Sequence, residues 1–241
     1  MTITVDFTAE EGTNSAGTSY QTGFHSTSGA NRVLLFYVCV TGAGTTLSSV
    51  TDTSGLTWHK RGSVSNTDTG GGVQDCELWW AYAPTQLTNF RVTANYGAST
   101  TVATCLIAVA GVYDPTAPWD GNASLPNTAV NSSNSSSATV QATGVYTDST
   151  NHMQLAFFST RSFTTPAAPA GWTDLGADNQ EPGAGGNRSY IRGNYLIESA
   201  KQTNETVASA TSTTAWTVLV DALASDAPLV KSTSFTATVI A

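Results

Sequence analysis

Short segments that alternate between polar and apolar residues constrain the fold of this chain more than any other feature. They are rich in β-branched and aromatic residues, and clusters of Gly, Asn, Asp and Ser separate them. No window of ten or more residues shows the periodicity of an amphipathic helix. The pattern therefore predicts an all-β protein. We expect strands near residues 2–8, 31–41, 47–52, 56–64, 74–83, 89–96, 101–111, 137–143, 152–160, 188–198, 204–210, 214–224 and 232–240.

The composition favours the same fold class. Of 241 residues, 66 are Thr or Ser and only 26 are charged. Helical proteins normally cover their solvent faces with Glu, Lys, Arg and Gln, because these residues have high helix propensity. With 40% apolar residues the chain can bury a large core, so we expect one compact domain over residues 1–241. Its hydroxyl-rich surface leaves little charge to oppose packing against neighbouring proteins.

Charge and apolar run length exclude two classes of partner. The net charge is −8 and no basic run occurs, whereas binding to nucleic acid needs clustered Lys and Arg. The longest apolar stretches, Val33 to Val40 and Cys105 to Ala110, are much shorter than the roughly 20 residues of a membrane-spanning helix. We expect neither nucleic-acid binding nor membrane insertion.

The chain contains an internal similarity between residues 31–111 and residues 151–224. Asn31-Arg-Val-Leu-Leu-Phe36 corresponds to Asn151-His-Met-Gln-Leu-Ala-Phe157. Further corresponding runs are Gly55-Leu-Thr-Trp58 with Gly171-Trp-Thr173, and Asn89-Phe-Arg-Val92 with Asn204-Glu-Thr-Val207. The alternative is that all β-sandwiches share such features. Either way, the order of elements predicts a two-sheet antiparallel β-sandwich of jelly-roll type, with pseudo-repeated halves.

Three stretches outside these strands read as long loops, residues 10–30, 112–136 and 161–187. Loops of this length in a compact domain are usually functional or mobile. The terminal strands at 2–8 and 232–240 bracket the two halves. They either complete their own sheet or pair with the sheet edge of a neighbouring molecule.

The cysteines indicate a buried structural role. Cys39, Cys76 and Cys105 each lie inside an apolar strand-like run, where a free thiol behaves as a small hydrophobic side chain. No two of them have the spacing of a metal site. Three cysteines cannot all pair within one chain, and a disulfide between two of them is the alternative. We expect free cysteines and no redox chemistry.

Several motifs, taken in order, resemble a β-sandwich module that recurs in bacteriophage virion proteins and in bacterial extracellular proteins. They are Val50-Thr-Asp-Thr-Ser-Gly-Leu-Thr-Trp58, Leu78-Trp-Trp-Ala-Tyr82, Ala108-Val-Ala-Gly111, Ala117-Pro-Trp-Asp120, Gly171-Trp-Thr173 and Ala215-Trp-Thr-Val-Leu219. The resemblance covers roughly residues 30–225 and implies a fold and a setting outside the cell. Because no signal peptide precedes the first strand, a phage particle protein is expected. A secreted bacterial protein without its leader is the competing explanation.

The sequence offers no catalytic constellation. Its three histidines, His25, His59 and His152, lie apart along the chain, and neither a Gly-x-Ser-x-Gly elbow nor a phosphate-binding glycine loop occurs. We expect no enzyme activity and no cofactor.

Calcium is likewise not expected. Asp114 with Asp120, and Asp174 with Asp178 and Glu181, lack the alternating ligand pattern of a calcium loop. Asx-turns explain these carboxylates as well.

The strand Gln74 to Tyr82 is the best candidate for a binding site. Alternation places Asp75, Glu77 and Trp79 on one face, whereas the opposite face reads as core. An indole beside two carboxylates suits a sugar, which stacks its apolar face on the ring and donates its hydroxyls to the carboxylates. A solvated strand face with one packed aromatic is the alternative. Trp119 and Trp172 are further candidate platforms, and a glycosidase that uses Asp75 or Glu77 is a weaker possibility.

These observations predict a non-enzymatic structural protein on the surface of a bacteriophage particle, as a head decoration or a tail appendage. Other virion proteins and copies of the same chain are its expected partners. The protein is expected to be made in the host cytoplasm and to reside in the virion. The alternative is a carbohydrate-binding module or adhesin that recognises a host-surface glycan.

Overall fold

The computed structural model describes residues 2–15, 17–42, 46–67, 72–99, 101–131, 139–161, 166–180, 188–210 and 215–225. Within these ranges the chain forms strands and no helix, so the predicted all-β fold is confirmed. The described residues accordingly include no helix able to cross a membrane. The strands are β1 (Thr4–Thr13), β2 (Gly17–Gln21), β3 (Arg32–Thr41), β4 (Leu47–Asp52), β5 (Trp58–Thr67), β6 (Val73–Ala83), β7 (Val92–Ser99), β8 (Thr101–Ala110), β9 (Asn127–Asn131), β10 (Thr139–Val145), β11 (His152–Thr160), β12 (Thr173–Gln180), β13 (Ser189–Glu198), β14 (Glu205–Ala210) and β15 (Trp216–Ala224).

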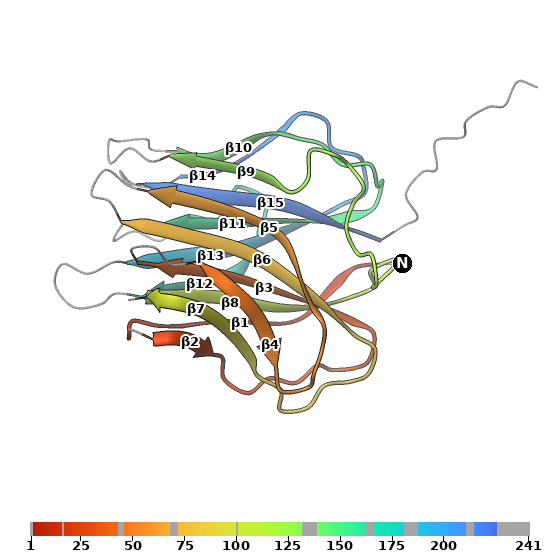
Figure 1. Ribbon diagram of the computed structural model, residues 1–241. Coiled ribbons are helices and arrows are strands. Elements are labelled where there is room, and N and C mark those ends of the chain that lie inside the picture. Colours follow the sequence, from red (N-terminus) through yellow and green to blue (C-terminus); the bar gives the residue numbers. More distant parts are fainter. Residues whose placement is uncertain are drawn as a thin grey trace, which may run out of the picture.

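The strands form four antiparallel sheets, more than the two that we expected (Figure 1). One large sheet has the order β1-β8-β3-β6-β5, and the other has the order β12-β13-β11-β15-β9. A three-stranded sheet, β2-β7-β4, covers the outer face of the first large sheet, and a two-stranded sheet, β10-β14, covers the outer face of the second. The two large sheets pack against each other through a central core. The protein is thus a pair of β-sandwiches joined back to back.

This layering explains the continuous apolar run in β3. Leu35 and Tyr37 point into the central core, whereas Leu34 and Phe36 point toward the three-stranded sheet. Both faces of the strand are therefore buried, and alternation between polar and apolar residues disappears. Strand β11 shows the same arrangement, because Phe157 lies in the central core and Phe158 lies under the two-stranded sheet.

The two halves have corresponding sheet orders. Read from one edge, the first large sheet has β1, β8, β3, β6 and β5 where the second has β9, β15, β11, β13 and β12. Corresponding turns also share left-handed backbone, since φ is +52° at Asn89 and +55° at Asn204, and +76° at Gly55 and +84° at Gly171. The halves are thus pseudo-repeated in structure. The jelly-roll winding and the single-domain assignment stay predictions.

One strand lacks a counterpart in the second half. In the first half β4 pairs with β7, but the stretch between β11 and β12 contributes no strand among its described residues, 166–172. This stretch includes Pro166 and Pro169, which have no N–H group to donate to a neighbouring strand. It contacts β14 through the hydroxyl of Ser209, which donates to the carbonyl of Ala167. The outer sheet of this half consequently has two strands.

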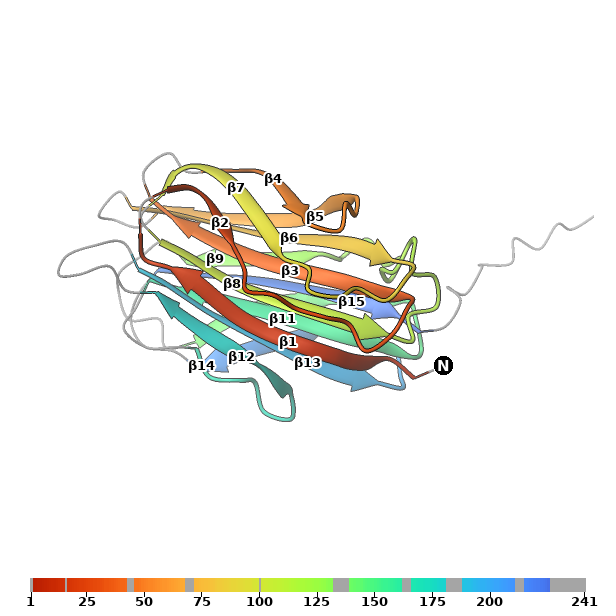
Figure 2. The ribbon, with the colours of Figure 1, turned by 90° about the horizontal axis from the view of Figure 1, so that it is seen from below.

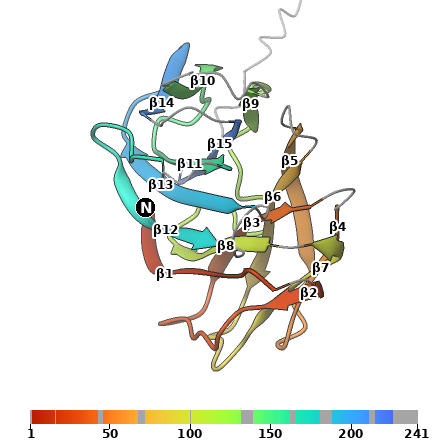
Figure 3. The same cartoon turned by 90° about the vertical axis from the view of Figure 1, so that its left-hand side faces the viewer.

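The prediction of three structureless loops is wrong in part. Strand β1 continues to Thr13 and β2 follows it within residues 10–30, while β9 lies within 112–136 and β12 within 161–187. These strands are short, half-exposed or at a sheet edge, so no buried face gives them an apolar alternation. Strands β1 and β12, the outer strands of the two large sheets, lie side by side (Figures 2 and 3). The predicted strand at 232–240 lies outside the described residues.

An ion pair joins the two large sheets. Arg61 lies at a bulge in β5, and its guanidinium donates to Asp221 of β15 from Nε at 2.8 Å and from Nη2 at 3.1 Å. Asp221 is completely buried, and burial raises the pKa of its carboxyl to about 6 although Arg61 opposes the shift. This pair fixes β5 over β15 next to the aromatic cluster described below.

Candidate ligand-binding site

The face of β6 that we expected to bear a sugar site is largely buried. Alternation along β6 is as predicted, but this face points toward the three-stranded sheet, and Asp75 and Glu77 retain only 7% and 3% of their exposure. Glu77 accepts hydrogen bonds from Lys60 Nζ at 2.5 Å and from Trp79 Nε1 at 2.7 Å. Burial, together with the neighbouring Glu77, raises the pKa of the Asp75 carboxyl. The two carboxylates therefore belong to an internal polar network, and neither lines either of the two hollows described below.

The predicted tryptophans lie in separate places. Trp79 packs on the core beneath the three-stranded sheet, whereas Trp172 packs on the core beneath the two-stranded sheet in the other half of the protein. Trp119 packs against the central core. The structure does not bring the three indoles together, so their joint role as a glycan platform stays a prediction.

An aromatic hollow occurs on the opposite face of β6. Trp80 and Tyr82 continue the face that carries Leu78 into the central core, but both are only partly buried, and Trp80 packs against that core. His59 of the edge strand β5 stands directly across from Trp80. The hollow has a volume of about 310 Å³, and its lining residues are Thr57, His59, Trp80, Tyr82, Pro84 and Thr116.

The aromatic rings of this hollow support one another. The rings of His59 and Trp80 lie with centroids 5.0 Å apart and planes tilted by 32°. Trp119 meets Trp80 edge to face, with centroids 6.3 Å apart, and Arg61 lies 4.8 Å from the centroid of Trp119. A backbone bridge to Leu223 of β15 holds Trp119 in place. Of the predicted residues, Trp119 thus belongs to this cluster as a second layer behind Trp80.

The lining of the hollow combines aromatic rings with hydroxyl groups. Polar groups around its rim are the hydroxyls of Thr57 and Thr116, the His59 ring and the Tyr82 hydroxyl, which donates to Asn31 Oδ1 at 2.7 Å. No carboxylate lines the hollow, and the neighbouring Arg61 is already paired with Asp221. An apolar ring face with hydroxyl and imidazole groups beside it matches one face of an uncharged sugar.

Sequence reasoning missed His59, Trp80 and Tyr82 as site residues. It assigned Trp80 and Tyr82 correctly to the face that carries the core, but it could not show that both side chains are only partly buried. The available signal is positional: both residues lie in the last four positions of β6, just before Pro84, where the strand leaves its sheet.

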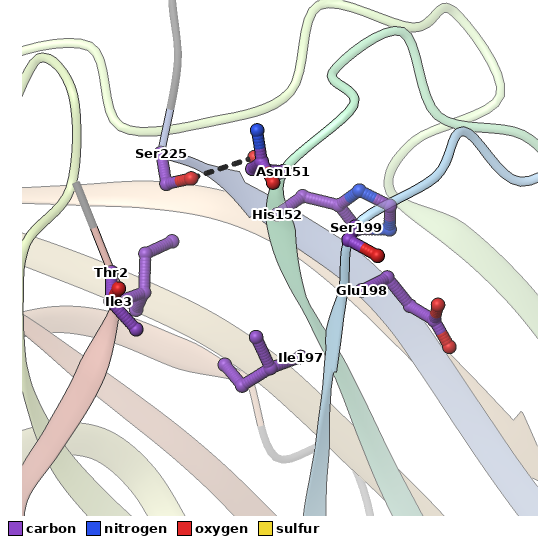
Figure 4. A pocket seen from close by; sticks show the side chains of 8 residues that line it. All are labelled: Thr2, Ile3, Asn151, His152, Ile197, Glu198, Ser199 and Ser225. Carbon is purple, nitrogen blue, oxygen red and sulfur yellow. Dashed lines mark hydrogen bonds between the residues drawn. The ribbon is translucent and has the colours of Figure 1, made fainter.

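A second hollow lies at one open end of the central core (Figure 4). It has a volume of about 210 Å³. Its lining residues are Thr2, Ile3, Asn151, His152, Ile197, Glu198, Ser199 and Ser225. Figure 4 shows the Ser225 hydroxyl bonded to the carbonyl of Asn151 at 3.0 Å, with His152 next to them. Burial lowers the pKa of His152, whose Nδ1 lies 3.1 Å from the Ser149 carbonyl. Without an aromatic platform, this hollow is the weaker candidate.

The acidic side chains that we considered as calcium ligands accept hydrogen bonds that stabilise turns and strands. Asp114 accepts from both the backbone N–H and the hydroxyl of Thr116, and Asp120 accepts from the backbone of Ser149 at 2.7 Å. Asp174 pairs with Arg192, and that pairing lowers the pKa of the Asp174 carboxyl. Glu181 lies outside the described residues, among which no group of three or more His, Cys, Asp or Glu side chains is arranged to hold a metal ion.

No protein-family model, curated protein or solved structure matches this chain. The resemblance to phage and extracellular β-sandwich modules therefore rests on the sequence motifs alone.

Proposed function

We propose that this chain is a non-enzymatic structural protein on the outer surface of a bacteriophage particle, as a head decoration or a tail appendage. The observation that carries this proposal is the doubled sandwich, in which β3, β8, β11 and β15 are buried on both faces. Such a block is stiff, because interiors of this kind are close-packed and resist deformation. Together with the motif resemblance and the charge-poor surface, this stiffness suits a protein that packs against other virion proteins and against copies of itself.

Particles produced without this protein provide the test. We expect negative-stain microscopy to show a missing surface feature and antibodies against the chain to label wild-type particles. Unchanged morphology together with no labelling would refute the proposal.

A second function, binding of a host-surface glycan, is favoured by the aromatic hollow. Trp80 provides an indole face on an exposed edge of the protein, and Tyr82 and His59 flank it with polar groups. This arrangement supports recognition of a neutral sugar ring better than the buried Asp75 and Glu77 do. The two functions are compatible, because a surface protein of a particle can also adhere to sugars.

A glycan array with the wild-type protein, followed by titration of the best neutral saccharide, tests this function. Trp80→Ala should weaken binding at least tenfold, which corresponds to about 1.4 kcal/mol. Trp172→Ala, which removes a half-buried indole from the other half of the protein, is the matched control and should bind like wild type. Equal loss in both variants, or no binding by wild type, would remove the hollow from consideration.

A further inference from the structure

Two of the three cysteines face each other inside the central core. Cys39 of β3 and Cys76 of β6 are directly opposite in the antiparallel register, and both are completely buried. Their sulfurs lie 2.7 Å apart. Non-bonded heavy atoms normally remain about 3.5–4.0 Å apart, whereas a disulfide bond is about 2.05 Å long. The two sulfurs are thus closer than an ordinary contact.

The backbone already has the geometry that a disulfide requires. Opposite residues in an antiparallel pair have Cα atoms about 4.5–5.5 Å apart, and disulfides span about 4.4–6.8 Å. Both side chains point to the same face of the sheet, because Cys39 and Cys76 are members of the central core. The spacing of the two strands is therefore compatible with a bond between them.

The surroundings make the two thiols unequal. Burial alone raises the pKa of Cys76, but hydrogen bonds from Cys39, Tyr37, Thr217 and Ser159 outweigh it and lower the pKa below its ordinary value. The Thr217 hydroxyl, for example, donates to Cys76 Sγ over 3.5 Å. Burial and the neighbouring Cys76 raise the pKa of Cys39.

Cys105 has a different environment. It stands opposite Tyr37 and Glu10 in the sheet and not opposite another cysteine. Burial and the nearby Glu10 carboxylate raise the pKa of its thiol. It therefore has neither a partner sulfur across the strand nor the charge environment of a reactive cysteine.

We propose that Cys39 and Cys76 are a modification site, at which a cross-strand disulfide forms between β3 and β6 in an oxidising environment, leaving Cys105 as a thiol. This inference does not depend on the proposed function. The oxidant is a small disulfide such as oxidised glutathione. The thiolate of one of the two cysteines attacks one of its sulfurs, the small disulfide bond breaks, and one small thiolate leaves and takes up a proton.

The second step closes the bond. The thiol of the other cysteine loses its proton, its sulfur attacks the protein sulfur of the mixed disulfide, and the second small thiol leaves with that proton. In total, two protein thiols and one small disulfide become one protein disulfide and two small thiols. Because both sulfurs are buried, the oxidant reaches them while the core is open during folding, and the folded core then shields the bond.

Refolding of the full reduced chain in a buffer of oxidised and reduced glutathione tests the proposal. After refolding, the protein is denatured in acid, alkylated and analysed by peptide mass spectrometry. We expect one alkylated thiol where the reduced chain has three, a mass lower by about 2 Da, and a linked peptide pair that contains Cys39 and Cys76. Three alkylated thiols in the folded protein, or a linked pair that involves Cys105, would overturn the proposal.

Two variants and a second route keep the result decisive. Cys105→Ala should form the same disulfide, whereas Cys39→Ala should retain both remaining thiols. If refolding is inefficient, the native reduced protein is incubated in the same buffer with urea below its unfolding midpoint, which opens the core transiently. The same peptide pair is then expected, and its absence after equilibration would count against the site.

Discussion

Replacing Asp221 by Asn should remove a specific part of the pH dependence of stability. The carboxyl of Asp221 is buried between the two large sheets, and its pKa is about 6 in the folded protein against an ordinary value of 3.8. The carboxyl group of Asp221 therefore binds its proton more tightly in the folded state than in the unfolded state. Between about pH 4 and pH 6 the folded state binds more protons, so the free energy of unfolding falls as the pH rises through this window.

The magnitude follows from the size of the shift. A difference of about two pKa units corresponds to roughly 3 kcal/mol at about 1.36 kcal/mol per unit. Asn keeps the size of the side chain and an oxygen that can accept from Arg61, but it does not titrate. The wild-type free energy of unfolding minus that of the variant should thus decrease by roughly 3 kcal/mol from pH 3.5 to pH 7.

Urea unfolding at four or five pH values, followed by far-UV circular dichroism, measures this difference. Subtracting the variant cancels the other titrating groups, provided that both proteins unfold in two states. Asp114→Asn, at an exposed turn, is the control. Because the Thr116 hydrogen bonds lower the pKa of Asp114, this variant should differ from wild type in pH dependence only at the acidic end and should retain the wild-type decrease from pH 5 to pH 7. A difference between wild type and Asp221→Asn that stays constant over this pH range would refute the assignment of the titration to Asp221.

Two further perturbations test the core and the backbone. Phe157→Ala should lower the free energy of unfolding by about 3–5 kcal/mol, because its ring stacks on Tyr37 at 4.6 Å in the central core; a loss below about 1 kcal/mol in urea unfolding would contradict this packing. Gly111→Ala should lower the melting temperature far more than Gly55→Ala: both glycines have positive φ, but only at Gly111 would a Cβ collide with backbone, 2.2 Å from the Thr2 carbonyl oxygen. Equal shifts in the two variants would show that the collision is relieved without cost.

Local patterns predicted the buried strands well, because buried strands have runs of apolar residues. The run Val33 to Val40 identified β3, and the corresponding Asn-led segment identified β11. What such patterns could not reveal was the number of layers. A strand that is apolar on both faces indicates only that each of its faces is covered. Whether the whole fold then has two sheets or four depends on long-range strand pairing.

The edge strands show the opposite problem. Strand β2 has no buried face along most of its length, so packing does not require apolar residues at alternate positions. Strand β12 contains Gly176 at a bulge, and its glycine and aspartate residues favoured a loop prediction. Both strands exist because a longer neighbour supplies the hydrogen-bonding partner, which no local window contains.

The aromatic hollow lies on the strand that carries the predicted Asp75, Glu77 and Trp79, but on the opposite face of that strand. Alternation separated Trp79 from Trp80 correctly, yet the face with the carboxylates is covered by β4 and β7, while the face that reads as core reaches the surface at Trp80. Which face of β6 is covered depends on how far the neighbouring sheets extend over it. The contact of Trp119 with Trp80 likewise depends on the path of a long connection, which sequence spacing does not specify.

The proline-containing stretch in place of a counterpart of β4 also affects how the protein behaves at high concentration. A free sheet edge presents a row of N–H and C=O groups to which another chain can add, and this is a common start of aggregation. Pro166 and Pro169 make the stretch beside β14 a poor template for such addition. Many copies can therefore be crowded together without exchanging strands at this edge.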